Sequence, residues 1–99
     1  MDDILTVKNI VDCLSLYEIR IIPFIGNDFI KVGRKEIKGL CNTSTKIIYI
    51  NSELDFTERK SVCIHELLHA ISDVKGLRLT EKEVYKLEKK YFNKIYKRK

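Results

Sequence analysis

The stretch Ser61-Val62-Cys63-Ile64-His65-Glu66-Leu67-Leu68-His69-Ala70-Ile71 holds both histidines of the 99-residue chain, in the pattern His-Glu-x-x-His. Residues four apart lie on one face of an α-helix, so His65 and His69 can each direct a ring nitrogen at the same cation. Apolar residues from Ile64 to Val74 recur at helical spacing around them. The stretch therefore predicts a half-buried helix that carries a metal site.

Glu66 follows His65 directly, which turns its carboxylate toward the open coordination position of the metal rather than toward the metal itself. A helix with this pattern is typical of zinc peptidases, in which the glutamate is the general base. We therefore expect one Zn2+ ion at His65 and His69, with Glu66 as the catalytic residue. A catalytic zinc keeps three protein ligands and one water, so a third ligand is needed.

The chain offers no third histidine for this position. Cys63, two residues before His65, should point away from the metal face, and we interpret it as a small core residue. Asp73 lies four residues after His69, on a face that drifts by about 40° per such step. It is either a group behind the ligands or a solvated surface acid.

Three glutamates of the last predicted helix are the remaining candidates for the third ligand, namely Glu81, Glu83 and Glu88. A short link before this helix should let a carboxylate early in it return toward the histidines. Glu83 is expected to cap the helix, and Glu88 lies beside the apolar stripe. Glu81 has no competing role beyond the helix dipole, so we favour Glu81 and keep Glu83 and Glu88 as alternatives.

The elements around the metal helix predict a small α+β domain spanning residues 1–99, with helices on one face of a sheet. We expect a helix over residues 3–16, capped by Asp2 or Asp3. Three or four antiparallel strands follow, over residues 17–24, 29–32, 37–42 and 45–51, the last two as a hairpin. The metal helix should cover residues 58–75, capped by Thr57 and ended by Gly76. A capping box of Thr80 and Glu83 should open the last helix, over residues 81–96.

The composition of the chain limits which classes of protein it can belong to. Hydrophobic residues make up 44% and charged residues 33% of the chain, as in soluble globular domains. Three widely spaced cysteines argue against a disulfide framework and for a reducing compartment. The acidic start is unlike a signal peptide, and no apolar run approaches the ~20 residues of a membrane span. The sequence therefore predicts a cytoplasmic protein with no membrane association.

The substrate side of the site can be outlined from chain order. An extended peptide could add to the sheet edge near the metal, and the strand at residues 47–50, which leads into the metal helix, is the candidate. A donor for the developing oxyanion is also desirable. Tyr49, Tyr85 and Tyr91 are available, and the sequence selects none of them.

The run from His65 to Ile71, followed by Gly76-Leu77-Arg78-Leu79-Thr80-Glu81, resembles small zincins. The similarity covers about residues 37–92 and is strongest to short metallopeptidase-like proteins of phages and mobile elements related to the ImmA/IrrE group. This resemblance implies a zincin-like fold, zinc at His65 and His69, Glu66 as base and Glu81 as third ligand. Members of the larger group are cytoplasmic proteases that cut a partner repressor, which implies a protein substrate.

Two other classes of function compete with a zinc peptidase. The chain could be a non-catalytic binding module on a zincin scaffold, although only two certain ligands are visible and a closed structural site needs four. It could also associate with nucleic acid, because the net charge is +5 and lysines with interleaved aromatic residues thicken after residue 88. A solvated amphipathic helix with a basic tail explains the same pattern. The oligomeric state is left open.

Overall fold

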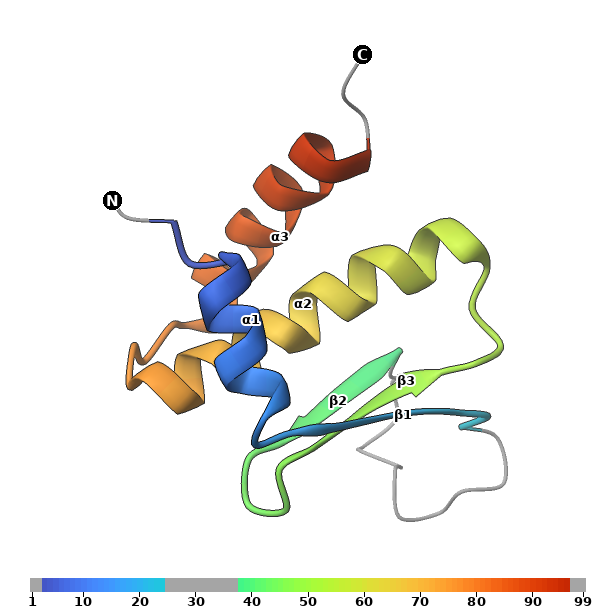
Figure 1. The fold of residues 1–99 in the computed structure, drawn as a ribbon. Helices are drawn as coiled ribbons and strands as arrows, with labels where there is room; N and C mark the ends of the chain where they lie inside the picture. Colours follow the sequence, from blue (N-terminus) through green and yellow to red (C-terminus); the bar gives the residue numbers. More distant parts are fainter. Residues whose placement is uncertain (1–2, 25–37, 97–99) are drawn as a thin grey trace.

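The computed structural model of the chain describes residues 3–24 and 38–96. Three helices and three strands follow one another in these residues (Figure 1): α1 (Val7–Leu14), β1 (Glu18–Ile22), β2 (Gly39–Asn42), β3 (Ile47–Asn51), α2 (Phe56–Lys75) and α3 (Glu81–Tyr96). The predicted α+β class and small zincin-like fold are confirmed. The strand predicted at residues 29–32 lies outside the described residues.

The sheet is mixed, with the strand order β1-β3-β2. β2 and β3 form the predicted antiparallel hairpin, with Gly39 opposite Ile50. β1 instead pairs with β3 in parallel, with Glu18 opposite Ile47, so the prediction of a wholly antiparallel sheet was wrong. Residues 23–46 separate these two strands, which is long enough for the crossover that a parallel pair needs. The alternating pattern that predicts a strand carries no information about its direction.

Two of the three helices have a different N-cap residue from the predicted one. Thr6 caps α1, in place of Asp2 or Asp3, by accepting a 3.1 Å hydrogen bond from the amide of Asn9. Asp55 rather than Thr57 caps α2, and its carboxylate accepts from the amide of Glu58 at 2.8 Å. Both are good capping residues, so propensity alone does not decide between neighbouring candidates.

The two boundaries between α2 and α3 agree with the prediction. Gly76 ends α2 in the left-handed region, at φ 65°. Thr80 and Glu83 form the capping box: the amide of Glu83 donates to Thr80 Oγ1 at 3.2 Å, and the amide of Thr80 donates to Glu83 Oε1 at 3.0 Å. The resulting link is short and brings the start of α3 back over the second half of α2.

α2 is the central element of the core. It packs on β2 and β3 on one side and contacts α1 and α3 on the other. The largest fully buried side chains come from all of these layers: Cys13, Ile48, Ile50, Leu68, Ile71 and Val84. No helix in the described part of the chain is long and apolar enough to cross a membrane. α2 is therefore held on two sides, which fixes the face that carries the histidines.

Candidate metal centre

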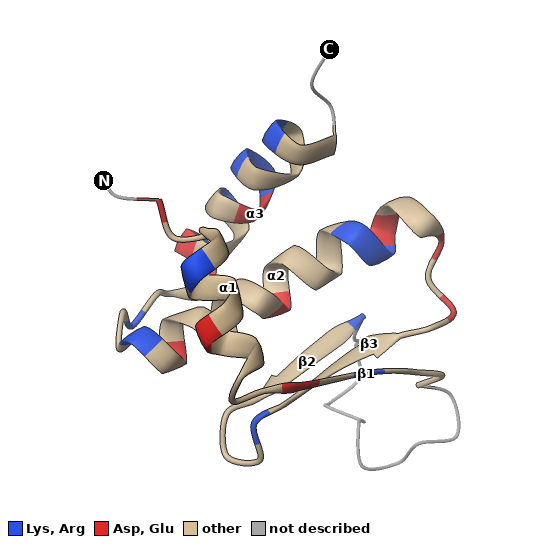
Figure 2. Cartoon of the chain, viewed as in Figure 1, with Lys and Arg blue, Asp and Glu red and all other residues tan. Residues whose placement is uncertain are grey.

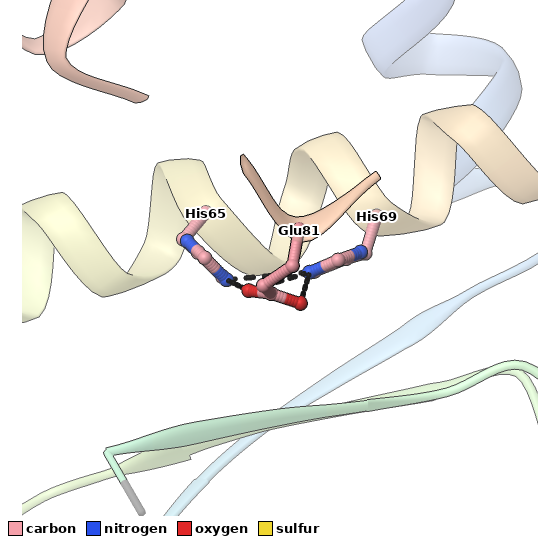
Figure 3. Close-up of side chains that lie close together, drawn as sticks. All are labelled: His65, His69 and Glu81. Atoms are coloured by element: carbon pink, nitrogen blue, oxygen red, sulfur yellow. Dashed lines mark hydrogen bonds and ion pairs between the residues drawn. The ribbon is translucent and has the colours of Figure 1, made fainter. Parts of the chain in front are cut away.

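His65 and His69 lie on one face of α2, where His65 is buried and His69 is partly exposed. Their Nε2 atoms face each other at 3.2 Å, and the two rings meet edge to face with centroids 4.9 Å apart. Figure 3 shows both rings pointing to the same side of the helix. The i, i+4 spacing thus brings two imidazole nitrogens to one point, as the sequence predicted for a helix.

Glu81, the first residue of α3, reaches the same point from that helix (Figure 3). Its Oε1 lies 2.7 Å from His65 Nε2, and its Oε2 lies 3.2 Å from His69 Nε2. The link after Gly76 places it there: Arg78 adopts a φ of 56°, and the amide of Leu79 donates to Ser72 Oγ at 3.0 Å.

The donor set of this site fits a zinc ion. One atom each from His65, His69 and Glu81 lies within 4.8 Å of the others. Ligands at zinc's usual bond lengths of 2.0–2.2 Å stand about 3.3 Å apart in a tetrahedron, close to the spacing found. Two neutral imidazole nitrogens that face each other can share only one proton, whereas a cation satisfies both lone pairs. Three protein donors also leave one position open, as in catalytic zinc sites.

Glu66 lies beside this donor set and is buried, with 7% of its surface exposed. Burial raises the pKa of its carboxyl to about 7; the positive character of His65 opposes this rise, and the carboxylates of Glu81 and Glu88 add to it. β2 covers Glu66 from the sheet side, where a Cβ on Gly39 would lie 3.0 Å from its Cγ and Oε2. The Glu66 carboxylate is thus enclosed between α2 and β2.

The other two glutamates of α3 that the sequence left open lie elsewhere. Glu83 is occupied in the capping box with Thr80. Glu88 contacts His65, but at Nδ1 (2.7 Å), on the opposite edge of the ring from Glu81. Of the three candidates, the structure brings Glu81 to the two facing Nε2 atoms.

Cys63 and Asp73 do not line the site. Cys63 is half-buried, and burial raises the pKa of its thiol. Asp73 accepts hydrogen bonds from the Tyr17 hydroxyl at 2.6 Å and from Lys46 Nζ at 2.5 Å, which together lower the pKa of its carboxyl. Asp73 therefore joins α2 to the start of β1 and to the β2–β3 turn rather than to the metal centre.

A pocket of about 670 Å³ opens over the donor set, between β2 and the two helices. Its lining comes from β2 and the residues beside it (Lys38, Gly39, Leu40, Cys41 and Thr43), from α2 (Glu58, Ser61, Val62, His65, Glu66 and His69) and from α3 (Glu81, Tyr85 and Glu88). Lys38 and Glu58 form an ion pair between the strand wall and the helix wall. β3 is the central strand, so the expectation that it offers the sheet edge was wrong; among residues 3–24 and 38–96, β2 is the outer strand on this side.

The three tyrosines considered as oxyanion donors differ in whether they line this pocket. Tyr91 is 3% exposed, and its hydroxyl accepts from the amides of Ile4 and Leu5. Tyr49 is 9% exposed and does not line the pocket. Tyr85 lines the pocket with its ring 4.7 Å from that of His65, and its hydroxyl has no hydrogen-bond partner among residues 3–24 and 38–96.

Sequence reasoning missed two features of the site. The contact of Glu88 with His65 Nδ1 joins residues 23 apart and has no local signature. The close approach of Gly39 to Val62 and Glu66 does have one, because a glycine inside a strand often marks a place where other groups come close.

The basic residues of α3, considered for nucleic-acid binding, spread along the helix (Figure 2). Lys90 and Lys94 each lie 3.9 Å from the carboxylate of Asp3. Residues 97–99 lie outside the described part. Nucleic-acid binding stays a prediction.

The sequence matches a family of known proteins. The model of a peptidase family described as the IrrE N-terminal-like domain matches residues 28–95. No curated protein and no solved structure matches the chain.

Proposed function

Because the chain belongs to the IrrE N-terminal-like domain family, which is metallopeptidase-like, we propose that it is a zinc-dependent peptidase that hydrolyses peptide bonds of a protein partner. The observation that carries this proposal is the convergence of His65 Nε2, His69 Nε2 and a Glu81 carboxylate oxygen beside the buried carboxylate of Glu66. The set supplies three ligands, an open position and an adjacent base, which are the parts that metal-assisted hydrolysis requires.

A zinc ion held by His65, His69 and Glu81 would polarise the substrate carbonyl and make water more acidic. Glu66 then accepts the proton of the attacking water and passes it to the leaving amine nitrogen. Its enclosure between α2 and β2 supports this role, because a base shielded from bulk water keeps its proton for the reaction. The other carboxylates that line the pocket in the described residues have different partners. Glu81 faces the two Nε2 atoms, Glu88 contacts His65 Nδ1, and Glu58 pairs with Lys38.

Tyr85 is the residue that we assign to the charge developing on the carbonyl oxygen. It stands in the pocket beside His65, with its hydroxyl unpartnered among the described residues. A hydroxyl with no hydrogen-bond partner in the described part of the protein can exchange water for an oxyanion and donate a hydrogen bond to it. The side chain is 55% exposed, so substrate can reach it.

The substrate of this site would bind as an extended strand along β2. Gly39, Leu40 and Cys41 line the pocket opposite the histidines, and β2 is the outer strand on this side of the described sheet. Main-chain hydrogen bonds to such an edge are independent of side chains, and the side-chain pockets then provide selectivity. An unstructured segment of a protein partner meets this requirement, because it can become extended without first unfolding.

The test compares zinc-loaded wild-type protein with Glu66→Gln on a fluorogenic random-sequence peptide library. We expect the variant to keep one zinc per chain and to lose cleavage by several orders of magnitude, because only the proton acceptor is removed. Glu53→Gln, at an exposed position in the connection before α2, removes the same charge and should cleave like wild type. Equal rates for the wild type and Glu66→Gln would overturn the proposal.

A further inference from the structure

The Nδ1 edge of His65 is held by a side chain from the other helix. Glu88 Oε1 lies 2.7 Å from this nitrogen, and both side chains are largely enclosed, with 11% of His65 and 17% of Glu88 exposed. The contact lies on the ring edge away from His69 and Glu81. Glu88 therefore acts on the ring from behind and does not compete for the position where a metal would bind.

The second oxygen of Glu88 is fixed as well. Glu88 Oε2 accepts a hydrogen bond from Ser61 Oγ at 2.5 Å. Ser61 lies on α2 one turn before His65, so one carboxylate of α3 bridges two residues on the same face of α2. A carboxylate held at both oxygens cannot rotate about its last bond without losing one of the two contacts. The direction in which it presents an acceptor to His65 is therefore set.

This contact also bears on the form of the imidazole. An ionised carboxylate only accepts hydrogen bonds, so Glu88 favours a proton on Nδ1 of His65, while Glu81 Oε1 favours one on Nε2 as long as no cation lies between them. When a cation occupies the site, or when Glu81 is removed, Glu88 alone decides: Nδ1 carries the proton and the other nitrogen of a neutral ring has the free lone pair. That nitrogen, Nε2, is the atom that faces His69 Nε2 at 3.2 Å and Glu81 Oε1 at 2.7 Å.

We infer that Glu88, braced by Ser61, is a positioning residue that holds His65 as the Nδ1-protonated tautomer with Nε2 aimed into the metal centre. The inference rests on the proposed function where it concerns zinc, and on the hydrogen bonds alone where it concerns the tautomer. Carboxylates in this place orient ligating histidines and make them more basic, and their removal typically weakens metal binding 10–100-fold.

The two histidines differ in this respect. His69 has contacts at Nε2, and no partner of its Nδ1 occurs in residues 3–24 and 38–96. His69 is also the more exposed, with 25% of its side chain accessible. His65 is therefore the histidine whose ring is held from both edges before a metal binds.

The first readout uses metal-free Glu81→Ala protein at about pH 8, where an ordinary histidine is neutral and no Glu81 carboxylate competes at Nε2. Nitrogen-15 shifts of the rings should show His65 as the Nδ1-protonated form in this protein. When Glu88→Ala is added, the shifts of His65 should move to a mixture of tautomers. Unchanged His65 shifts in the double variant would overturn the inference. This readout needs neither zinc nor activity, so it still tests Glu88 if the proposed function fails.

The second readout is the Kd for zinc. We expect Glu88→Ala to raise it 10–100-fold, and the nearly isosteric Glu88→Gln, which should fold even if the alanine variant does not, to raise it less. Tyr91→Phe is the control, because it loosens α3 by removing the acceptor of the Ile4 and Leu5 amides but lies outside the pocket. A wild-type Kd in Glu88→Ala and Glu88→Gln, or a loss in Glu88→Ala as large as that of Glu81→Ala, which would make Glu88 a direct ligand, contradicts the positioning role.

Discussion

Gly39 and Glu66 are in such close contact that a methyl group on Gly39 would lie 3.0 Å from the Cγ and Oε2 atoms of Glu66 and 2.6 Å from Val62 Cγ1. β2 and Glu66 thus share a surface that leaves no room for a side chain at position 39. Gly39 is opposite Ile50 in the β2–β3 pair, so the strand cannot retreat without disturbing the hairpin. This contact joins the fold to the chemistry of the site.

Gly39→Ala should therefore push Glu66 and β2 apart, and β2 is the strand along which we propose that substrate binds. We expect overpacking to lower the free energy of unfolding by about 1–3 kcal/mol and peptide cleavage to fall well beyond that of the control. Gly76→Ala is that control: its φ of 65° makes alanine unfavourable by about 1 kcal/mol, yet the residue is remote from the pocket. Chemical denaturation and cleavage rates measure the two effects. Wild-type cleavage by Gly39→Ala would contradict the close contact.

Tyr85→Phe removes the hydroxyl proposed to stabilise the oxyanion while keeping the ring beside His65. We expect kcat to fall about 100-fold, as when a single oxyanion donor is lost, with KM and zinc content unchanged. Tyr96→Phe, on the same helix but outside the pocket, should have wild-type kinetics. An unchanged kcat in Tyr85→Phe would remove this residue from the mechanism.

The Asp73 cluster makes stability depend on pH. Hydrogen bonds from Lys46 and then from Tyr17 hold the pKa of Asp73 below its usual value of 3.8. A carboxyl with a lowered pKa stabilises the fold fully above the unfolded-state value, and this contribution disappears as the pH falls through the folded-state value. Asp73→Asn should therefore be less stable than wild type at neutral pH, with the gap narrowing below about pH 4. Urea unfolding from pH 7 down to pH 2 measures this gap; a gap independent of pH would show that the carboxylate charge contributes nothing.

The Cys41 thiol should be unreactive in the folded protein although it lines the pocket. Burial raises its pKa from 9.0 to about 12, and the nearby Glu66 carboxylate adds to the effect. Only the thiolate is a nucleophile, so at neutral to mildly alkaline pH its alkylation should be about 1,000-fold slower than that of an ordinary thiol. Iodoacetamide labelling followed by mass spectrometry, with urea-unfolded protein as control, tests this. Rapid labelling of Cys41 in the native state would contradict this prediction and would mean that β2 moves away from α2.

Local signals predicted the helical hairpin well. Gly76 ends α2, Thr80 and Glu83 open α3, and α3 covers the predicted residues 81–96. Each of these features depends on residues within one helical turn. The start of α2 was missed by a few residues because Asp55 and Thr57 are both good caps, and their sequence does not rank them.

Contacts between distant residues escaped prediction. β1 and β3 are far apart in the sequence and pair in parallel, whereas the alternating pattern of a strand fits either direction. The same holds at the site, where the spacing of His65 and His69 is local and Glu81 is brought in by the link before α3. Capping and helix register left three glutamates open for that position, and the packing angle of α3 against α2 separates them. The Nδ1 contact of Glu88 depends on the same angle.

The most direct measurement of the central claim is the zinc content and zinc affinity of purified, reconstituted protein. We expect one zinc per chain in the wild type and a large loss of affinity in Glu81→Ala, because this removes one of three donors that lie within 4.8 Å of one another. Glu83→Ala, which removes a carboxylate of the same helix that serves only the cap, should bind zinc like wild type. A wild-type protein that takes up no zinc, or a Glu81→Ala variant that binds zinc as tightly as the wild type, would contradict the assignment of this site.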